Sequence, residues 1–431
     1  MIYYSLHKKA PNSTFKDAVI RGLAPDKGLY FPKHITALEP SFFEGIENLS
    51  DFEIAYKAIS QFIGDEISAE ALEAIVKDTL CFDFPVVELD HKISTLELFH
   101  GPTMAFKDVG ARFMARCLGY FNKNNSQKVT VLVATSGDTG GAVANGFLGV
   151  KGVDVVILYP SGKVSEIQEK QLTTLGQNIT ALEVDGVFDD CQDMVKKAFV
   201  DEQLTSKMQL TSANSINVAR WLPQLFYYLF AYKQLKYKYH NIAFSVPSGN
   251  FGNVCAGMVA QRLGMPVKHF IASNNANNVV TNYLKTELYN PKASVPTISN
   301  AMDVGNPSNF IRIQELYHSD FKRLKDNLSS YSFTDEETKA ALTEIYKTYN
   351  YVADPHGAVG YLGAKAHLAN HPNDHVVFLE TAHPTKFLDV VETELQITVE
   401  LPEQIQAVMD KEKSSVKISN YEDFKGYLLS Q

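Results

Sequence analysis

The chain has 431 residues, 45% of them hydrophobic and 21% charged, which is typical of a folded protein with two or three domains of about 150 residues each. Its formal net charge of −9 argues against a nucleic-acid-binding protein, because such proteins usually carry a basic surface. Its four cysteines are far apart in the sequence and form no CxxC pair, which argues against both a disulfide framework and a zinc ribbon.

The first ninety residues differ in pattern from the rest of the chain. They lack the apolar core of a secretion signal, and no stretch of the whole chain is long and apolar enough for a membrane span. We therefore expect a cytoplasmic protein without membrane partners. An extended, proline-containing stretch at 22–32 is followed by helical patterns at 51–63 and 68–78, so we predict an N-terminal cap domain over residues 1–90.

From about residue 90 onward, short apolar runs alternate with helical patterns. The runs predict strands at 128–135, 153–159, 179–184, 242–246, 267–272 and 375–379. Continuous apolar runs of this length suit parallel strands covered on both faces. Between two of them, Ser165 and Gln168 have capping-box spacing, and Gly176 is placed to end that helix at its C′ position. The alternation predicts an α/β fold with parallel sheets and helices on both faces.

Two later segments depart from this alternation. Residues 314–350 are more polar and helical, which predicts an excursion from the sheet. Residues 401–431 are expected to form a tail that returns over the surface.

The segment 96–108, Leu-Glu-Leu-Phe-His-Gly-Pro-Thr-Met-Ala-Phe-Lys-Asp, places Lys107 in an apolar, turn-rich setting. Desolvation disfavours the ammonium form of a lysine and so lowers its pKa. A neutral amine is what Schiff-base chemistry with an aldehyde cofactor requires.

Two glycine-rich junctions follow, each at the end of a predicted strand. They are Ala-Thr-Ser-Gly-Asp-Thr-Gly-Gly-Ala at 134–142 and Pro-Ser-Gly-Asn-Phe-Gly-Asn at 247–253. Ligands of parallel sheets gather at the carboxyl ends of strands, and backbone N–H groups at a helix N-terminus favour an anion. Neither junction is a Walker A loop or a GxGxxG fingerprint, and the chain has no HExxH or GxSxG pattern. We therefore predict no metal site and disfavour a nicotinamide enzyme.

In this order, the lysine segment and the two junctions resemble threonine synthase, and the resemblance covers nearly the whole chain. It also includes residues 22–32, 214–220, 300–304, 354–356 and 381–387. The order and the cap match the longer class found in bacteria and fungi. The resemblance implies pyridoxal phosphate as cofactor, fold type II, and conversion of O-phospho-L-homoserine and water to L-threonine and phosphate. It further implies a large cofactor-binding domain from residues 91–130 and 213–400, and a smaller mobile domain from residues 131–212.

The resemblance also implies which residues bind the cofactor. Lys107 would form the Schiff base, and Thr381 would hydrogen-bond the pyridine nitrogen through its hydroxyl. Asp138 stands where many relatives of this fold carry Asn near the cofactor's 3′-oxygen, so its role is open. The backbone amides that would bind the cofactor phosphate belong to Gly249, Asn250, Phe251, Gly252 and Asn253.

For the substrate, the resemblance implies that Ser136 and Thr139 contact the α-carboxylate and that Asn214 and Arg220 bind the phosphate. The planar fork of an arginine suits bidentate contacts with phosphate oxygens. Other residues keep two interpretations, one in the site and one as a surface, turn, packing or capping residue: Lys163, Asp303, His356, Lys386 and Asp108.

In the implied reaction, the cofactor ring acidifies Cα, Lys107 acts as the base, phosphate leaves Cγ and water adds at Cβ. A lyase acting on a phosphorylated amino acid, or a dehydratase giving 2-oxobutanoate, would keep the same cofactor residues. A non-catalytic binding protein would have no need of Lys107. Many members of the longer class are monomers, whereas the sequence itself leaves the oligomeric state open.

Overall fold

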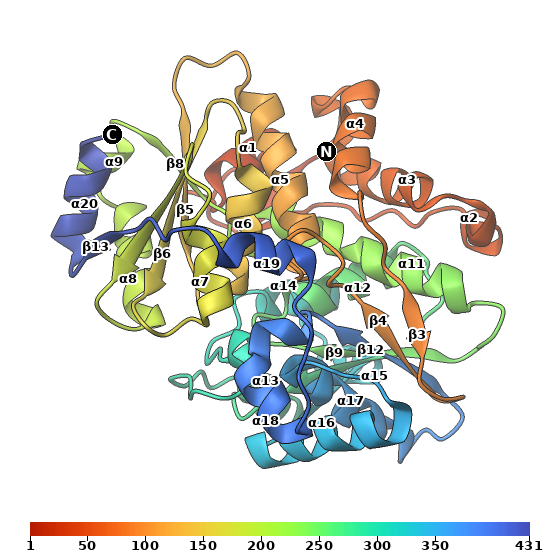
Figure 1. Ribbon diagram of the computed structural model, residues 1–431. Helices are drawn as coiled ribbons and strands as arrows, with labels where there is room; N and C mark the ends of the chain where they lie inside the picture. The colour runs from red at the N-terminus through yellow and green to blue at the C-terminus, as the bar shows by residue number, and fades with distance from the viewer.

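The computed structural model describes all 431 residues and contains two large sheets flanked by helices (Figure 1). The larger sheet has the order β11-β10-β9-β12-β4-β3 and is parallel except at its β3 edge. Its strands are β3 (Val86–Glu88), β4 (Ile93–Glu97), β9 (Ile242–Pro247), β10 (His269–Asn274), β11 (Leu328–Ser332) and β12 (His375–Glu380).

The smaller sheet is parallel throughout and has the order β13-β7-β6-β5-β8. Its strands are β5 (Val129–Ala134), β6 (Val153–Pro160), β7 (Ile179–Val184), β8 (Gln209–Ser212) and β13 (Val416–Ile418). In the N-terminal region, β1 (Tyr3–Ser5) and β2 (Tyr30–Pro32) form an antiparallel pair. The parallel sheets confirm the predicted fold class.

The helices divide among three parts of the molecule. The N-terminal region contains α1 (Phe15–Arg21), α2 (Pro40–Glu44), α3 (Asp51–Ile63) and α4 (Ala69–Thr79). Around the smaller sheet lie α6 (Asp138–Phe147), α7 (Glu166–Thr173), α8 (Phe188–Ala198), α9 (Glu202–Thr205), α19 (Glu403–Met409) and α20 (Tyr421–Leu429). The rest are α5 (Lys107–Asn122), α10 (Val218–Trp221), α11 (Leu225–Leu235), α12 (Gly252–Arg262), α13 (Val279–Thr286), α14 (Phe310–Leu316), α15 (Phe321–Asn327), α16 (Asp335–Tyr349), α17 (Pro355–Leu368) and α18 (Leu388–Leu395).

Both faces of the larger sheet are covered, which explains why its central strands are apolar along their whole length. On one face, α12 approaches so closely that a Cβ added to Gly257 would lie 2.7 Å from the Phe270 ring. On the other face, α17 contacts β9 through a hydrogen bond of 2.6 Å from the Ser245 hydroxyl to the Gly360 carbonyl oxygen.

The N-terminal region shares its core with the rest of the molecule. Buried residues such as Phe15 and Ile59 belong to one continuous apolar cluster with Phe113 of α5 and Phe226 of α11. The helix predicted at 51–63 has the bounds of α3, where Ser50 and Glu53 complete a capping box.

The structure differs from the sequence-based expectation in three segments. The polar segment 314–350 contains β11, which pairs in parallel with β10 and extends the larger sheet. The segment 401–431 contains β13 and α20, and β13 adds an edge strand to the smaller sheet. The Ser165 capping box is present, but α7 ends with Thr174 as its C-cap residue, so Gly176 lies one residue beyond the C′ position. None of the helices combines the length and the apolar character required to cross a membrane.

Candidate active site

Lys107 is held where two neighbouring strands of the larger sheet end. The chain leaves β4, makes a turn and enters α5 at Lys107, and the loop after β12 pairs with this turn. The backbone N–H of Phe106 donates to the Thr381 carbonyl (2.9 Å), and that of His383 donates to the Met104 carbonyl (3.1 Å). The position of Lys107 therefore depends on segments almost three hundred residues apart in the sequence.

A buried carboxylate and a second lysine lie beside the Lys107 amine. Asp138 Oδ2 lies 3.5 Å from Lys107 Nζ, and Asp138 Oδ1 lies 2.7 Å from Lys386 Nζ. The Lys386 side chain is fully buried and also donates to the Thr103 carbonyl (2.8 Å), while Gln168 Nε2 donates to Asp138 Oδ1 (3.1 Å). The sequence had left open whether Lys386 lies near the site, and its contact with Asp138 brings it there.

These charges, together with burial, shift the pKa values of Lys107 and Asp138. Desolvation lowers the pKa of the Lys107 amine, Asp138 opposes this effect, and the positive charge of Lys386 adds to it. Only 16% of the Lys107 side chain is exposed. Burial on its own would raise the pKa of Asp138, yet Lys386 and Lys107 hold it well below its usual range. The site therefore contains an ionised Asp138 beside an amine that loses its proton more easily than a solvated lysine.

The first glycine-rich junction runs from β5 into α6. Gly137 has a φ of +138°, and a Cβ there would lie 2.4 Å from the Gln168 side chain, so no other residue fits. The Thr135 hydroxyl oxygen accepts from the backbone N–H groups of Gly137 (3.0 Å) and Gly140 (2.8 Å), which fixes the loop. Ser136 and Thr139 are partly exposed beside Asp138 on this loop.

The second junction runs from β9 into α12. A Cβ at Gly249 would lie 2.7 Å from the Met302 Cα, so the chain can pass here only without a side chain. Asn250 fixes the outside of the turn, because its Nδ2 donates to the Ser215 hydroxyl (2.8 Å) and its Oδ1 accepts from the Ser308 N–H (2.6 Å). Phe251 has left-handed backbone angles (φ 63°, ψ 9°) directly before α12. The first N–H groups of α12 thus follow a narrow, rigid turn that can receive an anion.

The same turn is tied to the larger sheet by Asn253. Asn253 Nδ2 donates to the Pro247 carbonyl (2.9 Å) across the junction, and Gly252 is the first residue of α12.

Arg220 is a buried cation that forms no direct ion pair, although the charge of Asp108 favours its charged form. Its Nε donates to the Ala213 carbonyl (2.7 Å) and its Nη1 to the Lys107 carbonyl (2.9 Å), and no aspartate or glutamate forms an ion pair with it. Burial lowers the pKa of Arg220 to about 10, so the guanidinium remains charged at neutral pH. Asn214 is nearby in the chain, and its Nδ2 donates to the Ala134 carbonyl (3.2 Å) at the end of β5.

Two buried acidic residues, Asp354 and Glu380, form a hydrogen-bond network beside Thr381 that the sequence did not reveal. Glu380 Oε1 accepts from the Asp354 N–H (2.5 Å), while Asp354 Oδ2 accepts from the Ala382 N–H (3.3 Å). Burial raises the pKa of Glu380 well above its usual value of 4.5, and the negative charge of Asp354 raises it further. The protonated form of Glu380 is therefore more favoured than it is in a solvated glutamate. The only sequence signal for this network was a single acidic residue at the end of a predicted apolar strand.

His356 joins this network to the turn at Gly249. The Ala301 N–H donates to His356 Nε2 (3.2 Å), which leaves the proton on Nδ1, 2.5 Å from Asp354 Oδ1. Ala301 in turn lies against Gly249, since a Cβ there would be 3.0 Å from the Ala301 carbonyl oxygen. His356 thus supports the backbone on which the Gly249 turn rests.

The side chains of the other three residues whose role the sequence left undecided form no hydrogen bond or ion pair with Lys107 or Arg220 that would place them in the site. Asp303 accepts from the Thr297 hydroxyl (2.7 Å) and from Asn275 Nδ2 (2.8 Å), and burial raises its pKa to about 6. Asp108 accepts from the Thr103 N–H (2.9 Å) and hydroxyl (2.5 Å), so it fixes the preceding turn and does not cap α5. Lys163 is exposed on the surface.

Comparisons with known proteins extend over the whole chain. Residues 85–382 match the family model described as pyridoxal-phosphate dependent enzyme, residues 2–80 match threonine synthase N terminus, and residues 357–427 match threonine synthase, C-terminal. A threonine synthase of Buchnera aphidicola (subsp. Baizongia pistaciae) is 45% identical over 408 residues, covering 94% of each chain. The threonine synthase of Escherichia coli K12 is 43% identical over 406 residues, again covering 94% of each chain.

Solved structures agree with these sequence matches. The crystal structure of threonine synthase from Escherichia coli superimposes with a TM-score of 0.94 at 41% identity and covers 100% of both chains. A pyridoxal-phosphate-bound threonine synthase from Brucella melitensis gives a TM-score of 0.92 at 33% identity, covering 99% of this chain and 98% of that one. These findings confirm the resemblance, the fold and the cofactor expected from the motifs. With matches along its full length, the chain belongs to the threonine synthase family of pyridoxal-phosphate-dependent enzymes.

Proposed function

We propose that this chain converts O-phospho-L-homoserine and water to L-threonine and phosphate, with Lys107 as the residue that bonds to the cofactor and moves protons. The observation that carries this proposal is the Lys107 amine, which is desolvated, has a lowered pKa and lies at the carboxyl ends of β4 and β12. Pyridoxal phosphate, when bound, supplies an electron sink that makes the substrate's Cα–H acidic.

The chain's donor groups suit this cofactor. The turn of Gly249 to Asn253 and the N-terminus of α12 would hold its phosphate, because they offer backbone N–H groups where a side chain would clash. The Thr381 hydroxyl would accept or donate a hydrogen bond at the pyridine nitrogen. Asp138 would lie near the 3′-oxygen, where its charge is offset by Lys386 at 2.7 Å. That ion pair explains how a carboxylate can occupy a position at which many relatives carry a neutral Asn.

The substrate would bind between the two glycine-rich junctions. The Ser136 and Thr139 hydroxyls would hold its α-carboxylate on the first junction. Arg220 would hold its phosphate together with Asn214, because Nε and Nη1 of Arg220 are engaged with backbone carbonyls while no acidic side chain forms a direct ion pair with the guanidinium.

Lys107 then performs the proton transfers. The neutral Lys107 amine would take a proton from Cα, pass it on, and then take a proton from Cβ. Phosphate would leave Cγ while Arg220 stabilises its developing negative charge. Protons would return to Cγ and to Cα, and a water molecule would add its hydroxyl group at Cβ while its remaining proton goes to the released phosphate. Closure of residues 131–212 over the larger domain would exclude bulk water and limit simple β-elimination.

Every group in this scheme comes from one chain, so we propose that a monomer is sufficient for activity. All four cysteines are free, which suits a reducing compartment, and we propose that the protein acts in the cytoplasm.

Three experiments test the proposal. Borohydride reduction of the holoenzyme followed by peptide mapping should place the pyridoxyl group on Lys107, and Lys107→Ala should lose both the visible absorbance and turnover. Incubation with O-phospho-L-homoserine should give threonine, whereas 2-oxobutanoate as the only product would indicate a lyase. A pyridoxyl group on Lys386 or full activity of Lys107→Ala would refute the assignment.

A further inference from the structure

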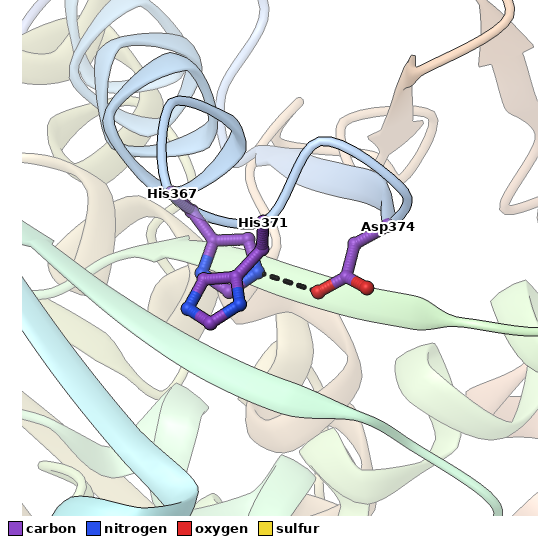
Figure 2. Close-up of side chains that lie close together, drawn as sticks. All are labelled: His367, His371 and Asp374. Atoms are coloured by element: carbon purple, nitrogen blue, oxygen red, sulfur yellow. Dashed lines mark hydrogen bonds and ion pairs between the residues drawn. The ribbon is translucent and has the colours of Figure 1, made fainter.

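A second cluster of chemically reactive side chains lies at the opposite end of β12 from Thr381. It consists of His367 in the last turn of α17, and of His371 and Asp374 in the connection between α17 and β12 (Figure 2). This cluster takes no part in the proposed reaction, because it is at the start of the strand whose far end leads into the active-site loop.

The three side chains converge on one point. One potential ligand atom from each lies within 4.8 Å of the others, and His367 Nε2 is 2.8 Å from Asp374 Oδ2. The rings of His367 and His371 lie side by side, with centroids 4.4 Å apart and an angle of 21° between their planes (Figure 2). Only 2% of the His367 side chain and 6% of the Asp374 side chain are exposed, whereas His371 is exposed.

Backbone hydrogen bonds also hold this arrangement. The His371 N–H donates to the His367 carbonyl (3.0 Å), and the Asp374 N–H donates to the His371 carbonyl (3.1 Å). The next residue, His375, begins β12, and its N–H donates to the Asn241 carbonyl (2.8 Å). The two buried groups are thus positioned in advance, and His371 is the exposed member of the cluster.

The charge at the cluster is unbalanced. Asp374 forms an ion pair with no lysine or arginine, and its one partner is the His367 imidazole. His269 of β10 stacks against His367 with ring centroids 5.4 Å apart, so it adds a third imidazole to the surroundings. A buried carboxylate without a lysine or arginine partner is an environment in which a bound cation gains electrostatic energy.

We propose that His367, His371 and Asp374 bind one divalent transition-metal ion of the Zn²⁺ class. Two imidazoles, one carboxylate and a water in the fourth position are a common Zn²⁺ ligand set, whereas Mg²⁺ and Ca²⁺ prefer oxygen ligands alone. Bonds of about 2.0–2.2 Å require the ligand atoms to lie within roughly 4.4 Å of one another. The three ligand atoms lie within 4.8 Å of one another, so binding would require at most a modest shift, which the exposed His371 side chain is the best placed to make.

The ion would connect the end of α17 to the start of β12. The other ends of these two elements carry Asp354 and Glu380, which support the loop beside Thr381. The metal is therefore expected to stabilise this helix–strand connection and to leave the reaction chemistry unchanged.

The test uses the holoenzyme without a polyhistidine tag, titrated with Zn²⁺ in a calorimeter and with Co²⁺ in a spectrophotometer. We expect one Zn²⁺ per chain, the intense visible bands of four-coordinate Co²⁺, and a higher unfolding temperature with Zn²⁺. His371→Ala should weaken Zn²⁺ binding at least about tenfold while keeping wild-type activity, because its side chain is exposed.

The matched control is His34→Ala, which removes another exposed histidine outside the cluster and should leave the binding unchanged. Wild-type protein that takes up no Zn²⁺ in excess metal would overturn the proposal. Equal Zn²⁺ affinity in wild type and His371→Ala would do the same, since it would assign the ion to other groups. If Asp374→Asn folds, it should weaken binding as His371→Ala does, and an unchanged affinity would again refute the site.

Discussion

The pair formed by Asp138 and Lys386 gives the sharpest test of the site's electrostatics. Both side chains are almost fully buried, with exposures of 3% and 0%, and their charged atoms are 2.7 Å apart. Replacing Lys386 by Met keeps the volume of the side chain and leaves the Asp138 carboxylate without its main counterion. Removing one partner of a buried pair generally costs about 3–5 kcal/mol of unfolding free energy.

The structure indicates the lower end of this range. In Lys386→Met, Asp138 keeps the hydrogen bond from Gln168 (3.1 Å), and Lys107 Nζ, which lies 3.5 Å from Asp138 Oδ2 in the wild type, remains beside it. We therefore expect a loss of about 3 kcal/mol at neutral pH, measured by urea unfolding of the holoenzyme. The double variant with Asp138→Asn should recover most of this loss, because it removes the unpaired charge.

The same substitution should change the pH dependence of activity. Lys386 helps to lower the pKa of Lys107, so its removal raises that pKa and more of the amine is protonated at a given pH. The acidic limb of the kcat/KM profile should therefore move to higher pH. A Lys386→Met protein that loses less than about 1 kcal/mol, or a double variant no more stable than the single one, would refute the reasoning.

Three further predictions concern other parts of the site. Glu380→Gln should gain stability relative to the wild type as pH rises above 4.5, because the folded-state pKa of Glu380 is raised, so the stability that Glu380 contributes is full below pH 4.5 and is lost at higher pH. If the difference in unfolding free energy between the two proteins is the same at pH 5 and at pH 8, this prediction is wrong. Gly249→Ala should weaken cofactor binding at least about tenfold, because the new Cβ would lie 2.7 Å from the Met302 Cα, whereas the control Gly426→Ala adds a Cβ in an exposed helix with nothing within 4 Å. Equal cofactor affinities of the two variants in absorbance titrations with pyridoxal phosphate would contradict the prediction. Arg220→Lys should lower kcat/KM by a factor of about ten or more, because a lysine keeps the charge but lacks the guanidinium that contacts two backbone carbonyls and would also contact the substrate phosphate. Unchanged kinetics with O-phospho-L-homoserine would exclude a role of Arg220 in binding the substrate phosphate.

Local sequence patterns were sufficient to predict an element where a single physical requirement determines it. Buried parallel strands need apolar side chains on both faces, so the run at 242–246 predicted β9 almost to the residue. The Ser165–Gln168 spacing predicted a helix start because its hydrogen bonds join residues close in sequence. Gly137 and Gly249 marked the junctions because no side chain fits at either position.

The edge strands β11 and β13 could not be predicted from local sequence patterns. β11 has the sequence Leu-Ser-Ser-Tyr-Ser and only its first residue is buried, so no apolar run distinguishes it from the helices around it. β13 is three residues long and lies some two hundred and thirty residues after its partner β7. Such strands exist because a sheet edge offers free hydrogen-bonding groups, and only the folded sheet creates that edge.

The sequence by itself determined the α/β class, and it predicted both a lysine suited to an aldehyde cofactor and two junctions suited to anions. Only the tertiary structure decided that Asp138 is paired with Lys386 and that Glu380 shares a buried network with Asp354. The reason is physical: the protonation state of a buried group depends on which charges surround it, and here those charges come from segments up to about two hundred and eighty residues apart. Spacing along the chain carries no information about such distances.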